Sequence, residues 1–300
     1  MIELGRLRAL SAVATYGTVF AAADVLHCTP SAVSQHITKL EQETGTNLFE
    51  KDGRKLRLTD AGRLLAEHAG LVLAAVERAE AALAAHHTTV SGRVTIASFA
   101  TGCRALLPQA LKRLAKEHPQ LETELLESNP HESLDLLARG EVDLALVDEW
   151  PEVPFPFPPG VEHTELGLDH ADLVVPASHP LAQRKRPVKL AQVTEERWVA
   201  STASTNCYEW LMRVMPGLRP SFLVEEFETQ LTLVATGLCI AAIPRLARIS
   251  VPSGVIILPI DPMPARHVIV AWRAASQERP AVLATVAALR KAWEKRVTAA

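Results

Sequence analysis

Apolar residues follow the helical period twice within the first 45 residues, on either side of a short turn. Thr18 is a good N-cap for the first of these helices. The apolar residues that we expect this helix to turn toward a small core are Phe20, Val25 and Leu26. The dipeptide His27-Cys28 then makes the turn.

The second helix combines an apolar stripe with a polar face. Thr29 is expected to cap it, and Pro30 occupies its first position, where a missing N–H costs nothing. The apolar stripe consists of Val33, Ile37 and Leu40, and the polar face of Ser31, Ser34, Gln35 and Thr38. Hydroxyls and an amide suit phosphate oxygens and base edges, and Gln can pair with adenine in the major groove. An ordinary solvated helix face would have a similar composition.

A basic segment between Leu48 and Leu58 favours the DNA-binding alternative. Its cations are Lys51, Arg54, Lys55 and Arg57, and its anions are Glu50 and Asp52. A β-hairpin with cations at its tip can follow the phosphate backbone beside a helix in the groove. Residues 1–60 nevertheless hold seven Lys and Arg against seven Asp and Glu. DNA affinity must therefore come from local placement and from dimerisation.

From Asp60 to about Thr88 the chain has no proline and reads as one long helix, of roughly 40 Å. Apolar residues spaced by four and three form a heptad seam of Leu65, Ala69, Val72, Val76, Ala79 and Leu83. We expect this helix to pair with its copy in a dimer; the alternative is an internal helix of a larger domain. The polar stretch 86–92 reads as a hinge.

After Gly92 strands and helices alternate. The first run reads as strand 93–98, helix 106–116, strand 121–127, helix 132–138 and strand 142–147. Such a βαβαβ order predicts a parallel sheet with right-handed crossovers. Five prolines in 151–159 predict an extended surface loop.

A second run of elements follows the proline-rich loop. It reads as strands 171–175, 198–200, 221–227 and 239–243, helices after Cys207 and over 230–236, strand 268–272 and helix 281–297. Because the last strand and helix come so late, we expect them to return to the first lobe, giving two α/β lobes joined by two crossing strands.

The chain resembles the LysR-type transcriptional regulators over essentially its full length. The N-terminal resemblance rests on 22–26, 29–34, Leu40-Glu41, Gly45, Leu48-Phe49, Arg54 and 58–62, and the C-terminal one on 107–108, Pro119, 136–146, 179–181, 234–237 and 243–244. Thr18, Gln35 and Lys51 stand where the family often has Ser, Arg and Arg. Because Lys keeps the charge of Arg but loses its fork, the preferred DNA sequence is the property these departures affect.

The resemblance implies an all-α-rich N-terminal winged helix-turn-helix over 1–59 and a linker helix with hinge over 60–91. A C-terminal two-lobed periplasmic-binding-protein-like α/β domain over 92–300 is expected to follow, with lobe I at about 92–163 and 268–300 and lobe II at about 164–267. It also implies a homodimer through the linker helix, a homotetramer, a double-stranded DNA operator and a small-molecule effector. The residues expected to contact DNA are Thr29, Pro30, Ser31, Ser34, Gln35, Thr38, Lys51, Arg54 and Thr59.

The effector is expected at strand ends and helix starts near the cleft between the lobes. The residues that these positions select are Ser98, Ala100, Thr101, Asp148, Thr202, Ser204, Phe227 and Thr229. Hydroxyls together with free helix N–H groups favour a small anion such as a carboxylate. No cofactor and no metal site is expected.

Composition and cysteines weigh on the competing functions. A net charge of −3 and 48% hydrophobic residues fit a folded protein, and the catalytic motifs of an enzyme are not apparent. A transport-type binding protein would explain the lobes but not residues 1–60. With four scattered cysteines, no signal-peptide core and no apolar run near 18 residues, we expect a cytoplasmic protein that does not cross a membrane. A thiol-based redox regulator of the same architecture is the alternative, because Cys103 and Cys207 fall near predicted helix starts in the cleft, where thiolate formation is favoured.

Overall fold

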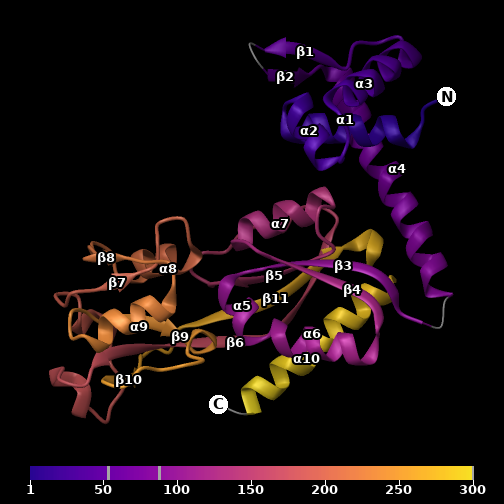
Figure 1. The fold of residues 1–300 in the computed structure, drawn as a ribbon. Coiled ribbons are helices and arrows are strands. Elements are labelled where there is room, and N and C mark those ends of the chain that lie inside the picture. Colours follow the sequence, from indigo (N-terminus) through magenta and orange to yellow (C-terminus); the bar gives the residue numbers. More distant parts are fainter. Residues whose placement is uncertain (53–54, 87–88, 299–300) are drawn as a thin grey trace. The chain divides into compact units, whose positions relative to one another are not determined.

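The computed structural model describes residues 1–52, 55–86 and 89–298 (Figure 1). The chain forms two units, one of residues 1–88 and 275–280 and the other of residues 89–274 and 281–300.

The N-terminal unit is a small helical core with a hairpin and a long helix. Its elements are α1 (Leu4–Tyr16), α2 (Val19–Val25), α3 (Pro30–Thr44), β1 (Phe49–Asp52), β2 (Lys55–Leu58) and α4 (Asp60–Ala85). Both predicted caps form, since Thr18 Oγ1 accepts from the Ala21 N–H and Thr29 Oγ1 from the Ala32 N–H, each at 3.2 Å. The predicted stripe of Val33, Ile37 and Leu40 is buried in this core.

The prediction that Phe20 faces the core is wrong, because its side chain is 73% exposed. Val25 and Leu26 are half-buried, whereas Ala22 and Ala23 are fully buried. The two alanines fill the short side of α2 that contacts α1 and α3, where small side chains allow a close approach of the helices. Phe20 is left on the outer side of a helix only seven residues long.

A tight junction joins the hairpin to α4. β1 and β2 pair antiparallel, with Phe49 opposite Leu58. Thr59 caps α4 by accepting from the Gly62 N–H at 3.0 Å, and its hydroxyl donates to the Asn47 carbonyl at 2.8 Å. A Cβ on Gly62 would lie 2.0 Å from the Leu48 carbonyl oxygen. A glycine is therefore required where the helix starts against the hairpin.

The long helix α4 has 26 residues, as the absence of proline predicted. Its first turns belong to the helical core of the same unit, because Ala69 is buried there and Leu65 packs against it. The predicted seam is therefore wrong for these two residues. Further along, Val72, Ala79 and Leu83 are exposed and Val76 is half-buried.

The C-terminal unit is built on one seven-stranded sheet. The strands follow the order β10-β6-β11-β5-β3-β4, with β9 also on β6. β3 (Ser91–Ser98) pairs in parallel with β4 (Gln120–Glu127) and with β5 (Leu144–Glu149), which confirms the predicted parallel βαβαβ unit.

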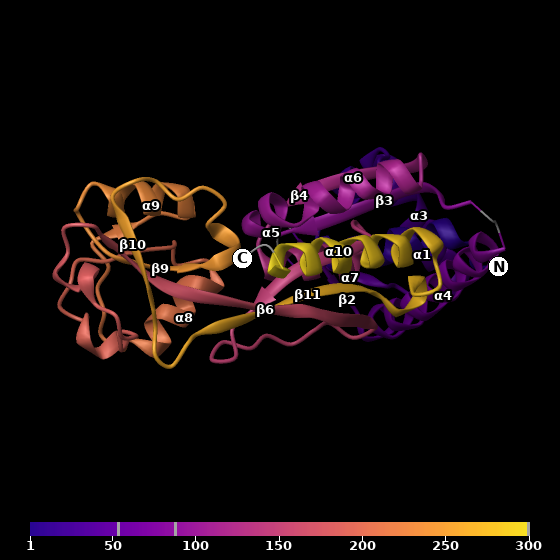
Figure 2. The same cartoon turned by 90° about the horizontal axis from the view of Figure 1, so that it is seen from below.

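Two antiparallel strands run through both lobes. β6 (Val161–Pro176) pairs with β11 (Ala265–Arg273) over its first part and with β9 (Ala241–Pro244) and β10 (Val255–Pro259) over its second. Figure 2 shows β6 and β11 side by side between the lobes, so the expected pair of crossing strands is confirmed.

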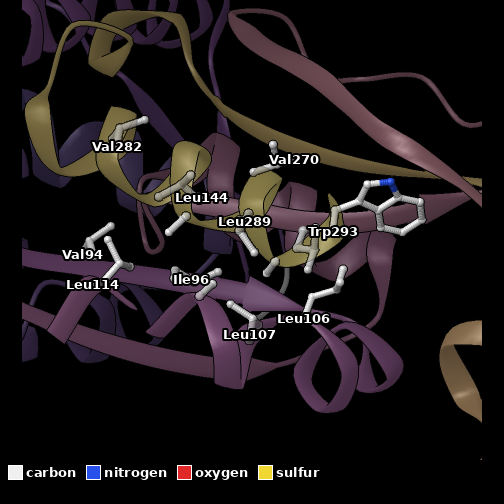
Figure 3. Close-up of a cluster of buried hydrophobic side chains, with 14 of the residues drawn as sticks. Val94, Ile96, Leu106, Leu107, Leu114, Leu144, Val270, Val282, Leu289 and Trp293 are labelled. Carbon is white, nitrogen blue, oxygen red and sulfur yellow. The ribbon is translucent and has the colours of Figure 1, made fainter. Parts of the chain in front are cut away.

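Helices cover both faces of the sheet in the first lobe. α6 (Leu107–Glu117) and α10 (Pro280–Thr298) lie over one face, and their core side chains meet those of β3 in Figure 3. α7 (Pro130–Arg139) packs on the other face, and α5 (Ala100–Ala105) follows β3. In the second lobe α8 (Asn206–Val214) and α9 (Phe227–Ala235) belong to two separate apolar clusters.

Several sequence-predicted boundaries in this unit are wrong. β6 begins ten residues before Ala171, since its polar first half is held by pairing with β11. β10 has no counterpart among the predicted strands. Phe227 begins α9 and does not end a strand, because β8 is only Phe222–Leu223. The proline-rich loop is not wholly on the surface, since Val153 and Phe155 are buried between its prolines.

Candidate DNA-recognition surface and effector cleft

The polar face of α3 is open to solvent. Ser31, Ser34, Gln35 and Thr38 are all exposed, while the opposite stripe of the helix is buried. Thr29 is exposed at the N-cap and Pro30 is half-buried beside it. A helix fixed by its apolar side and free on a polar side has the form of a recognition helix in a helix-turn-helix.

The hairpin contributes fewer free cations than its sequence suggests. Arg57 forms an ion pair with Glu50 at 2.5 Å across the two strands. Lys51 lies on β1 opposite Leu56, and its side chain is outside the described part of the structure. Arg54 lies outside the described residues altogether. The Thr59 hydroxyl is used in the junction with α4, and this leaves its contact with DNA a prediction only.

A pocket lies where the two lobes of the C-terminal unit meet. It measures about 470 Å³ including the solvent in its mouth, within the range of small-molecule sites. Four of the predicted effector residues line it, and these are Ala100, Thr101, Asp148 and Phe227. The remaining lining residues are Phe99, Arg104, Asn129, Pro130, Ser201, Thr205, Asn206, Cys207, Glu225 and Arg266.

The other four predicted effector residues do not line this pocket. Ser98 is fully buried and donates to the Phe99 carbonyl at 3.1 Å. Thr202 and Ser204 lie within 3.4 Å of each other, on the segment before α8. Thr229 is exposed on α9.

Arg266 is the central residue that sequence reasoning missed. Its guanidinium is buried and contacts two carboxylates, Asp148 at 3.1 Å and Asp169 at 2.9 Å. It also donates to Thr101 Oγ1 at 2.8 Å and lies over the Phe99 ring. An arginine at the edge of an apolar strand was the available signal, but the predicted strand began only at Val268.

The electrostatics of this cluster follow from burial and pairing. Burial raises the pKa of Asp148, and the nearby Arg266 offsets part of that rise. Burial by itself lowers the pKa of Arg266, but Asp148 and Asp169 reverse this and raise it. The arginine is therefore permanently charged and serves to neutralise buried carboxylates.

Polar contacts connect the two lobes around the pocket. Arg104 of α5 pairs with Glu228 at 3.0 Å and with Glu226 at 3.6 Å, at the start of α9. The Asn206 amide of α8 donates to the Asp148 carbonyl at 3.0 Å. A change in the angle between the lobes must break or rearrange these contacts.

The cysteines lack the activation that the redox alternative requires. Burial raises the pKa of the Cys207 thiol to about 12, even though Arg266 lies 3.8 Å from its sulfur. Burial also raises the pKa of Cys103. The prediction that their positions favour thiolates is therefore wrong, because desolvation outweighs any benefit from a helix start.

Thiol labelling should reveal this difference. With a thiol-specific chromogenic disulfide at mildly alkaline pH, we expect exposed Cys28 to react rapidly and Cys207 to react only on unfolding. The rates are assigned with Cys28→Ser and Cys207→Ser variants. Rapid labelling of Cys207 in the folded protein would show that its thiol is activated.

Metal ligands and membrane-spanning helices are both absent from the described residues. No group of three or more His, Cys, Asp or Glu among them could hold a metal ion. None of the described helices is both long and apolar enough to cross a membrane.

Comparisons with known proteins agree with this architecture. Residues 4–63 match the family model "Bacterial regulatory helix-turn-helix protein, lysR family", and residues 87–294 match "LysR substrate binding domain". The molecule is thus a DNA-binding helix-turn-helix protein with a two-lobed α/β effector-binding domain. The chain belongs to the LysR family of transcriptional regulators, a family of regulators and not of enzymes.

Individual relatives are distant. The chain is similar to a probable RuBisCO transcriptional regulator of Chlorokybus atmophyticus, at 30% identity over 61% of this chain and 58% of that protein. It is 29% identical to the HTH-type transcriptional regulator MetR of Escherichia coli, over 82% of this chain and 75% of that one. Among the curated relatives it matches, the chain thus spans only a little over half the length of the Chlorokybus protein.

A solved structure shows the same fold. A full-length variant of OxyR from Pseudomonas aeruginosa superposes with a TM-score of 0.75, at 22% identity and covering 97% of this chain and 95% of that chain.

Proposed function

We propose that this regulator binds double-stranded operator DNA as a homodimer, with α3 in the major groove and the β1–β2 hairpin along the backbone. The observation that carries this proposal is the solvent-open polar face of α3, fixed by a buried stripe and a capped start. In this proposal residues 1–59 form the DNA-binding domain, 60–91 the linker and hinge, and 92–300 the effector domain. The lobe limits remain those predicted from the sequence.

Dimerisation is proposed through the later turns of α4. Val72 and Leu83 are exposed apolar residues, 42% and 68% accessible, on a helix whose first turns already pack in their own unit. Exposed apolar residues at heptad spacing favour pairing with a second copy of the helix. The homotetramer rests on the family resemblance.

The effector is proposed to bind in the pocket between the lobes. A ligand that prefers one arrangement of the lobes shifts their equilibrium, and the linked dimer then changes its placement on DNA. This proposal requires no thiol chemistry, and the raised pKa of Cys207 speaks against the redox alternative.

Gln35 is expected to determine base preference. Gln35→Ala should lose about 1–3 kcal/mol on the preferred operator and relax specificity at one position in each half-site, because it removes a bidentate contact. The operator is obtained by selection from random duplexes, and the binding of variants is measured by gel shift at fixed salt.

Gln42→Ala is a matched control for this experiment. Gln42 is exposed on the same helix two turns further on, away from the start of α3 that enters the groove. It should leave specificity unchanged. Equal effects of both substitutions, or none from Gln35→Ala, would contradict the proposed orientation of α3.

A further inference from the structure

The inter-lobe pocket holds two guanidinium groups, and both are already bound by carboxylates. The nitrogens of Arg266 make five contacts: Nε and Nη2 reach Asp169, Nη1 reaches Asp148 and the Cys207 sulfur, and Nη2 also reaches Thr101. A guanidinium has five N–H donors, so these contacts use its capacity. Arg104 is paired with Glu226 and Glu228. Neither cation is left to receive a carboxylate from a ligand.

Carboxylate oxygens, in contrast, remain open to the pocket. Asp148 is 3% exposed and lines the pocket, and only its Oδ2 accepts from Arg266. Within the described chain, no other side chain donates to its Oδ1. Glu225 also lines the pocket and, among the described residues, has no ion-pair partner. Five carboxylates therefore surround two guanidinium groups.

The buried position of Asp148 makes this excess significant. Burial raises its pKa although Arg266 is in contact, which means that its charge is incompletely compensated. A cation brought to its free oxygen would complete the compensation, whereas a second carboxylate would add repulsion in a partly desolvated site.

Helix starts at the pocket act in the opposite direction but are mostly occupied. The start of α8 is capped by Thr205, and α9 starts beside Glu226 and Glu228. Only at α7 does the N-cap, Asn129, make no side-chain cap, so a carboxylate belonging to a ligand that is also cationic can be accepted there.

We propose that the effector carries a protonated amino group, which the pocket binds against Asp148 and Glu225. The ligand class is therefore amines and amino acids. Simple carboxylates, which the hydroxyl-rich segments of the sequence had suggested, are excluded. This inference rests on the proposed function in taking the inter-lobe pocket as the effector site.

The test uses the full-length protein and ligands matched in carbon skeleton. The probes are butylammonium, 2-aminobutyrate and butyrate, with lysine and adipate as larger members. Binding is measured by calorimetry and by thermal stabilisation, at about 10 mM, which nearly saturates a site with a Kd of about 1 mM. We expect the members with an amino group to bind and butyrate and adipate not to bind.

Variants connect binding to the two carboxylates. Glu225→Gln, on the surface, should weaken binding of the amino-group ligands about tenfold, the size of a hydrogen bond to a charged group. Glu225→Lys should shift the preference toward carboxylates. Glu195→Gln, exposed in the same lobe and outside the pocket lining, is the matched control and should change nothing. Asp148→Asn is interpreted only if its unfolding transition is intact.

Two outcomes would overturn the proposal. One is binding of butyrate or adipate that Glu225→Gln leaves unchanged or strengthens. The other is no binding by any amino-group probe. In either case sequence-specific DNA binding that depends on Gln35 would leave the proposed regulator standing, so the two failures are distinguishable.

Discussion

Arg266→Met is expected to lower the free energy of unfolding of the C-terminal unit by about 3–5 kcal/mol, the cost of removing one partner from a buried ion pair. The substitution keeps most of the side-chain length but leaves Asp148 and Asp169 buried without their cation. Thr101 also loses its donor. Urea unfolding followed by tryptophan fluorescence measures the change, because Trp150 and Trp210 are buried in the second lobe.

The deficit should depend on pH. Burial already raises the pKa of Asp148, and removing Arg266 takes away the attraction that opposes this rise. A carboxyl group with a raised pKa stabilises the folded state when it is protonated, and this contribution is lost as the pH rises through the folded pKa. The variant should therefore approach the wild-type stability as the pH falls from neutrality toward about 4, near the ordinary pKa of Asp.

Arg245→Met provides the matched comparison. Arg245 binds Asp172 at 2.9 Å, but its side chain is 43% exposed and Asp172 keeps a second partner in Arg248. We expect a loss of about 1 kcal/mol or less for this exposed pair. A pH-independent deficit in Arg266→Met, or one no larger than that of Arg245→Met, would refute the role given to the buried cluster.

The N-terminal unit was largely predictable because its signals are local. Thr18 and Thr29 cap helices through N–H groups three residues away, and Pro30 marks the start of α3. Such contacts are encoded within one turn of the chain. Phe20 failed because hydrophobicity alone does not say which side of a short helix its neighbours cover.

The pocket was less predictable because its contacts are distant in sequence. Arg266 meets Asp169, Asp148 and Thr101 across 97, 118 and 165 residues. Strand ends correctly suggested Thr101 and Asp148, since β3 and β5 are parallel neighbours and end at the same edge. Arg266 enters from an antiparallel strand, which no local period in the sequence places beside them.

The same nonlocality explains the expectation of a carboxylate ligand. Hydroxyls and helix starts are visible in the sequence, and they favour anions. The pairing of Arg104 and Arg266 with acidic residues is visible only in the fold. The net charge that a ligand meets is therefore a property of tertiary structure.

The linker helix also divides into a part that the unit uses itself and a part that is free. Ala69 is buried in the N-terminal core, whereas Val76 lies on the later heptad positions. Val76→Asp would place a carboxylate opposite its copy in the proposed dimer, without a compensating cation. We expect a shift from dimer to monomer and a loss of operator affinity of about 100-fold, corresponding to roughly 3 kcal/mol.

Leu71→Asp distinguishes this seam from a competing one. Leu71 is 67% exposed and lies about 140° around the helix from Val76, next to the exposed Leu64 one heptad earlier. If the dimer forms through Val76, a charge at Leu71 remains in solvent and affinity changes little. Sedimentation equilibrium and gel shift are measured on both variants, with circular dichroism to verify folding. Loss of the dimer in Leu71→Asp but not in Val76→Asp would move the interface to the Leu64–Leu71 side of α4, because only the buried face of a pair is sensitive to a new charge.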